Sequence, residues 1–458
     1  MERLLTFLAI LFMSVLGESA RAATWYVDDS ARGKADGTSW TNAYVDLQHG
    51  LWAASSGDRI WVAAGIYFPG GTARDTFQLK TGVEVIGGFG AVPGTERSFK
   101  ARDFESFISV LSGDIGRDDG SDPAGILKDA AGIVGQNSNH VVTGSGTDPT
   151  AVLDGFIITG GQASSGVSAG EGGGMLNREG SPTLLNLKFS GNTAEGDGAG
   201  MFNSSFSNPT LINVFFAGNS AGRFGGGMYN FVSAPSLVNV AFSGNQAREK
   251  GGAISNLGSS PSITHVTFFG NSAGEGGGMC NEGTSTPTIH NSILWGNTSK
   301  IRGDQVLNLD SESIPGISHS LVEGSVASGG GWDKDIVEDL GSNIDSNPLF
   351  VDADGADDIA GTLDDNLGPR IGSPARDKGD NQQLPPDRQD LNGDKDIAET
   401  IPFDIKGNPR IFSKIVDLGA FEGQGPSLRI ECRRRKHPLR PLHQHLLGPW
   451  CRLQHPLL

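Results

Sequence analysis

The chain has 458 residues, of which 68 are glycine, about twice the usual share. Hydrophobic residues make up 37% of the chain, which excludes simple disorder, and glycine does not recur at every third position as it does in collagen. The formal net charge is −17 although residues 427–458 are basic, so the rest of the chain is strongly acidic. This charge disfavours nucleic acid and anionic membranes as partners.

Residues 1–22 have the pattern of a secretory signal peptide. Arg3 supplies a positive charge, residues 4–16 are almost wholly apolar, and Ala20 and Ala22 frame an A-x-A cleavage site. The apolar run is too short to cross a membrane, and no later stretch approaches ~18 apolar residues. We therefore expect cleavage before Ala23 and a mature protein that is secreted or held at the cell surface, with no transmembrane segment.

Residues 23–150 are expected to form an N-terminal cap and irregular first coils. Apolar residues at 44, 47, 51 and 54 have helical spacing, with Thr41 or Asn42 as the N-cap. A helix here would cover the apolar end and the open strand edge of the first coil of a repeat structure. Apolar stretches such as DRIWVAAGIY and GVEVIGGFG then predict weaker coils from about residue 55 onward.

Residues 151–300 contain a repeat of about 26 residues. One proline and one Gly-Asn pair mark each copy: Pro182, Pro209, Pro235, Pro261 and Pro287, with Asn192, Asn219, Asn245, Asn271 and Asn297. Such regularity predicts a solenoid in which one repeat makes one coil. We expect an all-β fold, a right-handed parallel β-helix reaching to about residue 340. The right-handed sense is expected from the general preference of parallel crossover connections, because the repeat spacing does not determine handedness.

The columns of this repeat predict which side chains face the core. The inward columns are Met175, Met201, Met228, Ile254 and Met279, and Phe189, Phe216, Phe242, Phe268 and Leu294. The alternation of a strand breaks at Asn186, Asn213, Asn239, His265 and Asn291. These residues predict a turn with left-handed backbone and an amide ladder between coils. The glycines ahead of each methionine column are expected to take positive φ and to avoid Cβ clashes at a tight corner.

The outward positions offer weak candidates for a site. One outward column is Leu176, Phe202, Tyr229, Ser255 and Cys280, and another is Lys188, Phe215, Ala241, Thr267 and Ile293. Phe202 and Tyr229 are candidates for stacking on a sugar ring, with packing under loops as the alternative. Charged residues before the glycine corners could frame a site or form a solvated corner: Glu195, Asp197, Arg223, Glu249 and Lys250.

Cysteine and histidine give few further candidates in residues 23–426. Cys280 is the one thiol there, so no disulfide framework is expected. His265 and His290 are the two histidines of the repeats. They are candidates for a metal or acid–base role. The alternatives are that His265 is a variant position of the amide ladder and that His290 is a surface residue.

Residues 301–426 should hold the last coils and an acidic, loop-rich region. Asp390, Asn392, Asp394 and Asp396 alternate there with Glu399 beyond, as in a calcium loop. The loop departs from the EF-hand pattern, since Lys395 stands where glycine is required. Calcium is therefore the one cofactor considered, with an acidic turn as the alternative, and residues 352–358 form a similar, weaker pattern.

Residues 427–458 differ abruptly in composition from the rest. Cysteines and histidines there could hold zinc, but their spacing matches no standard ligand set: Cys432, His437, His443, His445 and Cys451. A basic tail at a membrane surface is another possibility. We expect instead a segment read out of frame or a disordered end that packs on nothing.

Two parts of the sequence resemble known families. The alternation of GG[A/G]-x-x-N and F-x-x-N over about residues 151–300 resembles the repeats of chlamydial polymorphic outer-membrane proteins. The run from NPLFVDADG through GSPARDKGD to VDLGAFE resembles the choice-of-anchor Q domain, which ends secreted bacterial β-helix proteins of the pectin-lyase-like superfold. In this run Arg376 precedes Asp377, where the family has Ile or Val. The resemblance implies the fold and export, and no particular activity.

These observations favour an exported, monomeric β-helix protein that adheres to surfaces or binds glycan without catalysis. The alternative is a polysaccharide lyase or glycoside hydrolase, for which the resemblance implies carboxylates and an Arg or Lys base on the outer face of one sheet. An outward cluster of two carboxylates and a basic residue would favour the enzyme. A flat face of small and aromatic residues would favour the binding protein.

Overall fold

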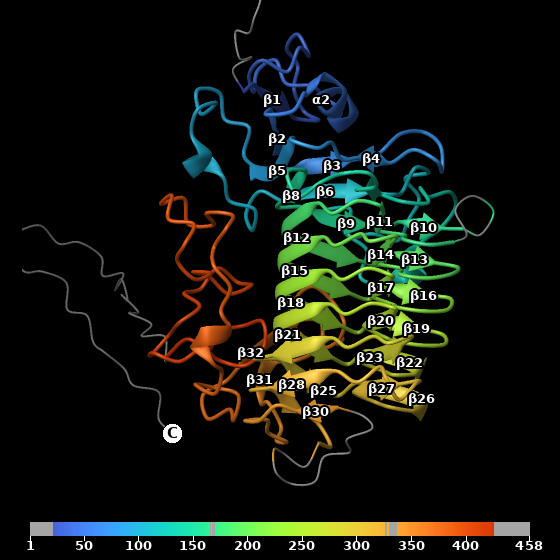
Figure 1. Ribbon diagram of the computed structural model, residues 1–458. Helices are drawn as coiled ribbons and strands as arrows, with labels where there is room; N and C mark the ends of the chain where they lie inside the picture. Colours follow the sequence, from blue (N-terminus) through green and yellow to red (C-terminus); the bar gives the residue numbers. More distant parts are fainter. Residues whose placement is uncertain (1–21, 165, 167–169, 326–327, 329–336, 426–458) are drawn as a thin grey trace, which may run out of the picture.

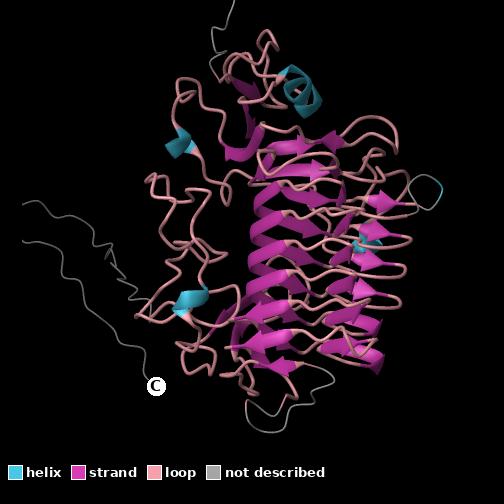
Figure 2. Ribbon diagram, in the orientation of Figure 1, coloured by secondary structure: helices cyan, strands magenta, loops and turns pink. Residues whose placement is uncertain are grey.

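The computed structural model describes residues 22–164, 166, 170–325, 328 and 337–425. Its strands stack into a right-handed parallel β-helix, which confirms the predicted fold class (Figure 1). Figure 2 shows that strands and loops make up nearly all of this part of the chain. The predicted signal peptide and the basic segment 427–458 lie outside the described residues, apart from Ala22.

Three parallel sheets form the sides of the solenoid. The 16-stranded sheet contains β1 (Thr24–Val27), β2 (Arg59–Ala63), β3 (Gly65–Tyr67), β5 (Glu84–Phe89), β6 (Ser109–Ser112), β8 (Val152–Asp154), β9 (Ile157–Thr159), β12 (Thr183–Ser190), β15 (Thr210–Ala217), β18 (Ser236–Ser243), β21 (Ser262–Phe269), β24 (Thr288–His290), β25 (Ile293–Trp295), β28 (Gly316–Ser318), β29 (Leu321–Val322) and β30 (Glu338–Asp339).

The other two sheets have shorter strands. The methionine sheet contains β4 (Phe77–Gln78), β7 (Val142–Thr143), β11 (Met175–Arg178), β14 (Met201–Ser204), β17 (Met228–Phe231), β20 (Ile254–Leu257), β23 (Met279–Glu282) and β27 (Val306–Asn308). The polar-edged sheet contains β10 (Gln162–Ala163), β13 (Thr193–Ala194), β16 (Ser220–Ala221), β19 (Gln246–Ala247), β22 (Ser272–Glu275) and β26 (Thr298–Arg302).

The predicted core columns fill the interior. Phe189, Phe216, Phe242 and Phe268 are fully buried, and neighbouring rings stack with centroids 4.7 to 5.3 Å apart. Met175 pairs in register with Met201, and this column is also fully buried. Because each coil sets the same side chain above its copy, one favourable packing arrangement is repeated along the solenoid.

The corners also follow the predicted chemistry. The asparagine column has positive φ, from 51° at Asn186 to 57° at Asn213. The side-chain amides of Asn213 and Asn239 each donate to the side-chain oxygen of the preceding asparagine, as Asn213 does to Asn186 over 3.1 Å. A Cβ on Gly174 would lie 2.5 Å from the Gly200 oxygen, so this corner excludes larger residues. The structure adds two ladders that the sequence analysis did not predict, one starting at Asn177 and one at Asn192.

The N-terminal cap differs from the prediction in two ways. The solenoid begins at β1, before the helix and well before residue 55, since β1 pairs in parallel with β2. The helix α2 (Leu47–Ala53) has Asp46 as its N-cap, in place of Thr41 or Asn42, and the Asp46 carboxylate accepts the Gln48 amide over 2.8 Å. Leu47 and Leu51 of this helix are buried against the first coils, as a cap requires.

The C-terminal region, residues 345–425, lies along one side of the solenoid (Figure 1). It contains one antiparallel pair, β31 (Phe350–Asp352) with β32 (Asn366–Pro369), and the short helix η3 (Asn381–Gln383); two further short helices, η1 (Phe99–Ala101) and η2 (Ala130–Gly132), lie in the N-terminal third. No helix within the described ranges is long and apolar enough to span a membrane.

Candidate functional site

The C-terminal region covers an outward face of the 16-stranded sheet. Phe215 and Ala241 point away from the core, yet both are buried, in a cluster with Leu367, Ala420 and Phe421. A second outward column, which includes Ile212, is buried with Ile401. Apolar residues at outward positions of the repeat strands are the sequence signal for this covering region.

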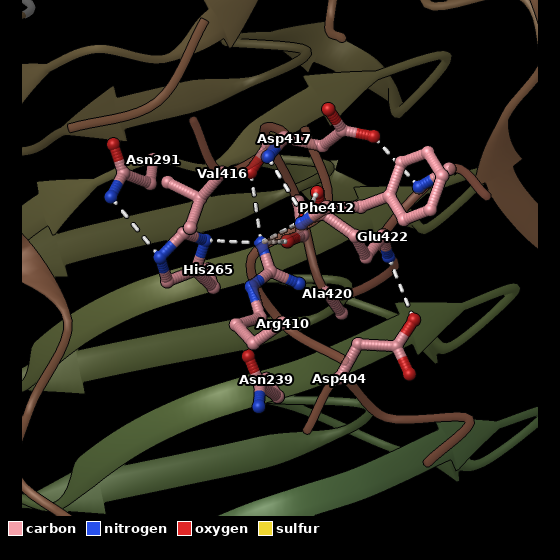
Figure 3. Close-up of polar contacts among 12 residues, drawn as sticks. Asn239, His265, Asn291, Asp404, Arg410, Phe412, Val416, Asp417, Ala420 and Glu422 are labelled. Atoms are coloured by element: carbon pink, nitrogen blue, oxygen red, sulfur yellow. Dashed lines mark hydrogen bonds and ion pairs between the residues drawn. The ribbon is translucent and has the colours of Figure 1, made fainter. Parts of the chain in front are cut away.

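Arg410 fastens this region to the asparagine column (Figure 3). The side chain is fully buried, and its Nη2 donates to the His265 Nδ1 and to the carbonyl oxygens of Asp417 and Gly419. Asn291 donates to the Asp380 carbonyl oxygen and accepts the Asp380 amide. The amide ladder of the solenoid therefore serves as a docking surface for a distant part of the chain.

His265 occupies an asparagine position, with φ of 55° and no exposed surface. Burial, and then the Arg410 charge, lower the pKa of His265 well below its ordinary value. Both of its ring nitrogens face nitrogen atoms, in Arg410 and in Asn291. The structure thus places His265 as a variant ladder position, while His290 is half-buried with its Nδ1 2.8 Å from the Ser318 hydroxyl.

A groove of about 520 Å³ crosses the coils where β13, β16 and β19 begin. Its floor includes Thr193, Ser220 and Gln246, the first residues of these three strands. One wall is formed by residues 128–131 of the N-terminal third, and the other by residues 359–362 of the C-terminal region. The groove is therefore assembled from three parts of the chain that are far apart in sequence.

Two serines at equivalent positions hold the walls in place. Ser190, the last residue of β12, donates to the Leu127 carbonyl oxygen over 2.6 Å. Ser243, the last residue of β18, donates to the Asp365 carboxylate, which also accepts the Gly361 amide over 2.8 Å. Because both serines are buried in regular strands, the walls are fixed relative to the floor.

Glycines on the solenoid allow the walls to approach closely. A Cβ on Gly218 would lie 2.5 Å from the Lys128 carbonyl oxygen, and one on Gly244 would lie 2.4 Å from the Gly361 Cα. Both glycines have positive φ, near 60°. At the equivalent Gly270, one coil further along, nothing lies within 4 Å, so the walls end there.

A second cluster of polar groups lies outside the methionine sheet. Arg223 pairs with Asp197 at 2.6 Å, and Arg178 pairs with Glu171 at 2.6 Å. Asp197 is almost fully buried, and one of its carboxylate oxygens has no hydrogen-bond partner. Burial raises the pKa of Asp197 to about 6, with Arg223 opposing this effect and Glu171 adding to it.

Phe202 and Tyr229 lie side by side on this face, with ring centroids 5.6 Å apart. They are 3% and 6% exposed, in a cluster with Leu176, and Phe224 packs against Tyr229. Rings that are buried in this way do not form an open platform for a sugar ring. Their surroundings fit the alternative, in which both rings pack under the neighbouring turn.

In the acidic segment 390–399, the side chains of Asn392, Asp394 and Glu399 lie together. Asn392 donates to Asp394 over 3.2 Å and to Glu399 over 2.6 Å. Asp390 and Asp396 accept backbone amides of their own loop. Calcium binding requires such oxygen ligands to converge on one ion, and a calcium site in residues 390–399 stays a prediction.

Among the described residues, one group of three acidic side chains has ligand atoms within the reach of a single ion. Asp114, Asp118 and Asp119 bring one carboxylate oxygen each within 4.8 Å of one another. Asp114 also accepts the amides of Asp118 and Asp119, which shapes the loop without a metal. The sequence analysis did not single out this loop, although its D-x-x-x-D-D spacing is visible in the chain.

Comparison with known proteins gives structural matches of low sequence identity. No family model matches the sequence, and no curated protein matches it. A pectate lyase, Pel9A, is 14% identical in a structural match that covers 88% of this chain and 97% of that chain, with a TM-score of 0.46. A rhamnogalacturonan lyase is 11% identical over 72% of this chain and 91% of that chain, with a TM-score of 0.37. The assignment of the fold rests on the strand pairing above.

Proposed function

We propose that the protein is an exported, non-catalytic β-helix protein that binds glycan at a cell surface or outside the cell. The observation that carries this proposal is the groove of about 520 Å³ between residues 128–131 and 359–362. Its volume lies within the range of small-molecule sites, and its floor offers hydroxyl and amide groups. Export is proposed from the pattern of residues 1–22.

The arrangement of the groove favours binding over catalysis. Lys128, the basic side chain on its rim, is paired with Asp357 at 2.5 Å. Asp129, the carboxylate on the same wall, accepts the Ala131 amide as the cap of a short helix. General acid–base cleavage needs two groups that can exchange protons on either side of the scissile bond, and the floor of hydroxyl and amide groups offers none.

The proposal is tested by applying the full chain to a glycan array and to cleavage assays on the same panel. We expect retention on at least one glycan, with no new reducing ends and no unsaturated products. Retention of none of the glycans would overturn the binding proposal. Cleavage of a retained glycan would overturn its non-catalytic part.

A polysaccharide lyase or hydrolase remains the second candidate because of Asp197. Two carboxylates, Glu171 and Asp197, and the basic Arg223 lie together on the outer face of the methionine sheet. A buried carboxyl group with pKa of about 6 is suited to proton transfer near neutral pH. If cleavage is observed, Asp197→Asn should abolish it, while Glu249→Gln in an exposed turn should not.

A further inference from the structure

The polar-edged sheet presents a strip of uncharged side chains to the outside. The first residue of every strand has a hydroxyl or amide group: Gln162, Thr193, Ser220, Gln246, Ser272 and Thr298. These residues pair in register from coil to coil, as Thr193 does with Ser220 and Ser220 with Gln246. In five of the six strands, β26 excepted, the next residue is a buried alanine, such as Ala194 or Ala221. The strip is thus set by strand alternation, with one polar group per coil.

Part of this strip lies in the groove. Its floor contains three consecutive members, Thr193, Ser220 and Gln246, which are half-buried or exposed and thus accessible. Neighbouring coils repeat every ~4.8 Å. A ligand that lies along the solenoid axis therefore meets a hydrogen-bonding group at regular intervals. A polymer of similar units can satisfy these groups in the same way at each coil.

The charges around the groove indicate an uncharged ligand. The Lys128 ammonium group is paired with Asp357, so the two charges offset each other and the pair offers no net positive charge to an acidic sugar. Asp129, on the same wall, is exposed and would repel one. The chain as a whole has a net charge of −17, which adds to this repulsion at low ionic strength.

We infer that the groove binds a neutral oligosaccharide chain lying along the coils, with Thr193, Ser220 and Gln246 as its hydrogen-bonding floor. This inference rests on the proposed function and adds the class of ligand and the residues that contact it. The wall residue Ile359 is 50% exposed at the rim. It offers an apolar contact for the face of a sugar ring.

The test uses the full chain with Ser220→Trp, which fills the groove, and Gln246→Ala, which removes one floor amide. Ser262→Trp and Gln382→Ala are matched controls, because both residues are exposed and lie outside the groove. The probes are soluble neutral β-glucan, mannan and xylan oligosaccharides, with oligogalacturonate as the anionic probe. We expect binding of a neutral probe, weakened at least tenfold by each groove variant and unchanged in the controls.

Several outcomes would overturn the inference. They are binding of the anionic probe alone, or neutral binding that both groove variants leave intact; in either case glycan binding itself stands. Binding of no probe overturns the proposed function as well. If Ser220→Trp fails to fold, as judged by circular dichroism and melting temperature, the exposed Gln246→Ala decides the question alone.

Discussion

At the scale of single residues, the buried asparagines of the solenoid are hydrogen-bonded to their copies on neighbouring coils and to backbone oxygens. Asn219 is fully buried and donates to the Asn245 and Phe189 oxygens over 2.8 and 3.0 Å. Asp197 differs, since it is buried with one oxygen unpaired. A carboxylate buried in this way costs free energy when it is charged.

This cost predicts an unusual pH dependence for Asp197. Burial raises its pKa from 3.8 to about 6, so the folded state favours the protonated form. The resulting stabilisation is present below about pH 4 and is lost as the pH rises through 6, by at most about 3 kcal/mol. Asp197→Asn cannot titrate, and we expect its melting temperature relative to wild type to increase between pH 4 and 7.5. A difference that stays constant with pH would show that Asp197 is not buried as an acid.

At the scale of elements, the repeat could be predicted because every coil contains the residues that set its own turns. Proline, the left-handed asparagine and the glycine corner recur in every copy, and together they define one coil. The docking of residues 345–425 could not be predicted in the same way. It depends on single contacts, such as that between Arg410 and His265, which are 145 residues apart and belong to no pattern.

We expect Arg410→Met to release the C-terminal region while the solenoid stays folded. The change removes the contacts with His265 and with two carbonyl oxygens, and breaking such a buried polar network costs about 3 kcal/mol. Limited proteolysis should then cut within residues 345–425 and leave residues 24–164 and 170–325 resistant. Arg370→Met, at an exposed position, is the control. Equal resistance of both variants would mean that the remaining contacts, such as those between Asn291 and Asp380, fasten the region without Arg410.

Calcium gives a prediction for the two acidic loops. A calcium site implies that a chelator lowers the melting temperature, since an ion that binds only the folded state stabilises it. Because Asp114, Asp118 and Asp119 place three carboxylate oxygens within 4.8 Å of one another, we expect Asp118→Asn with Asp119→Asn to remove the effect and Asp394→Asn to keep it. If Asp394→Asn removes the effect and the double variant keeps it, the calcium site lies in residues 390–399. No effect of the chelator on wild type would exclude calcium from both loops.

At the scale of the whole molecule, the groove exists only because the N-terminal third and the C-terminal region meet over the regular coils. Lys128 and Asp357, which tie the two walls together, are 229 residues apart. The floor was visible in the sequence as a polar position after each Gly-Asn pair, but nothing local to it indicates walls. Phe202 and Tyr229, the aromatic candidates that the sequence indicated, are buried.

Hydrogen–deuterium exchange of the full chain, with and without a retained oligosaccharide, tests the location of binding most directly. The account predicts protection together at residues 127–131, 218–220, 244–246 and 359–362, because one ligand would contact the floor and both walls. Exchange at residues 171–178 and 197–203 should stay unchanged. Protection confined to those two segments, on the outer face of the methionine sheet, would contradict the account and place binding beside Asp197.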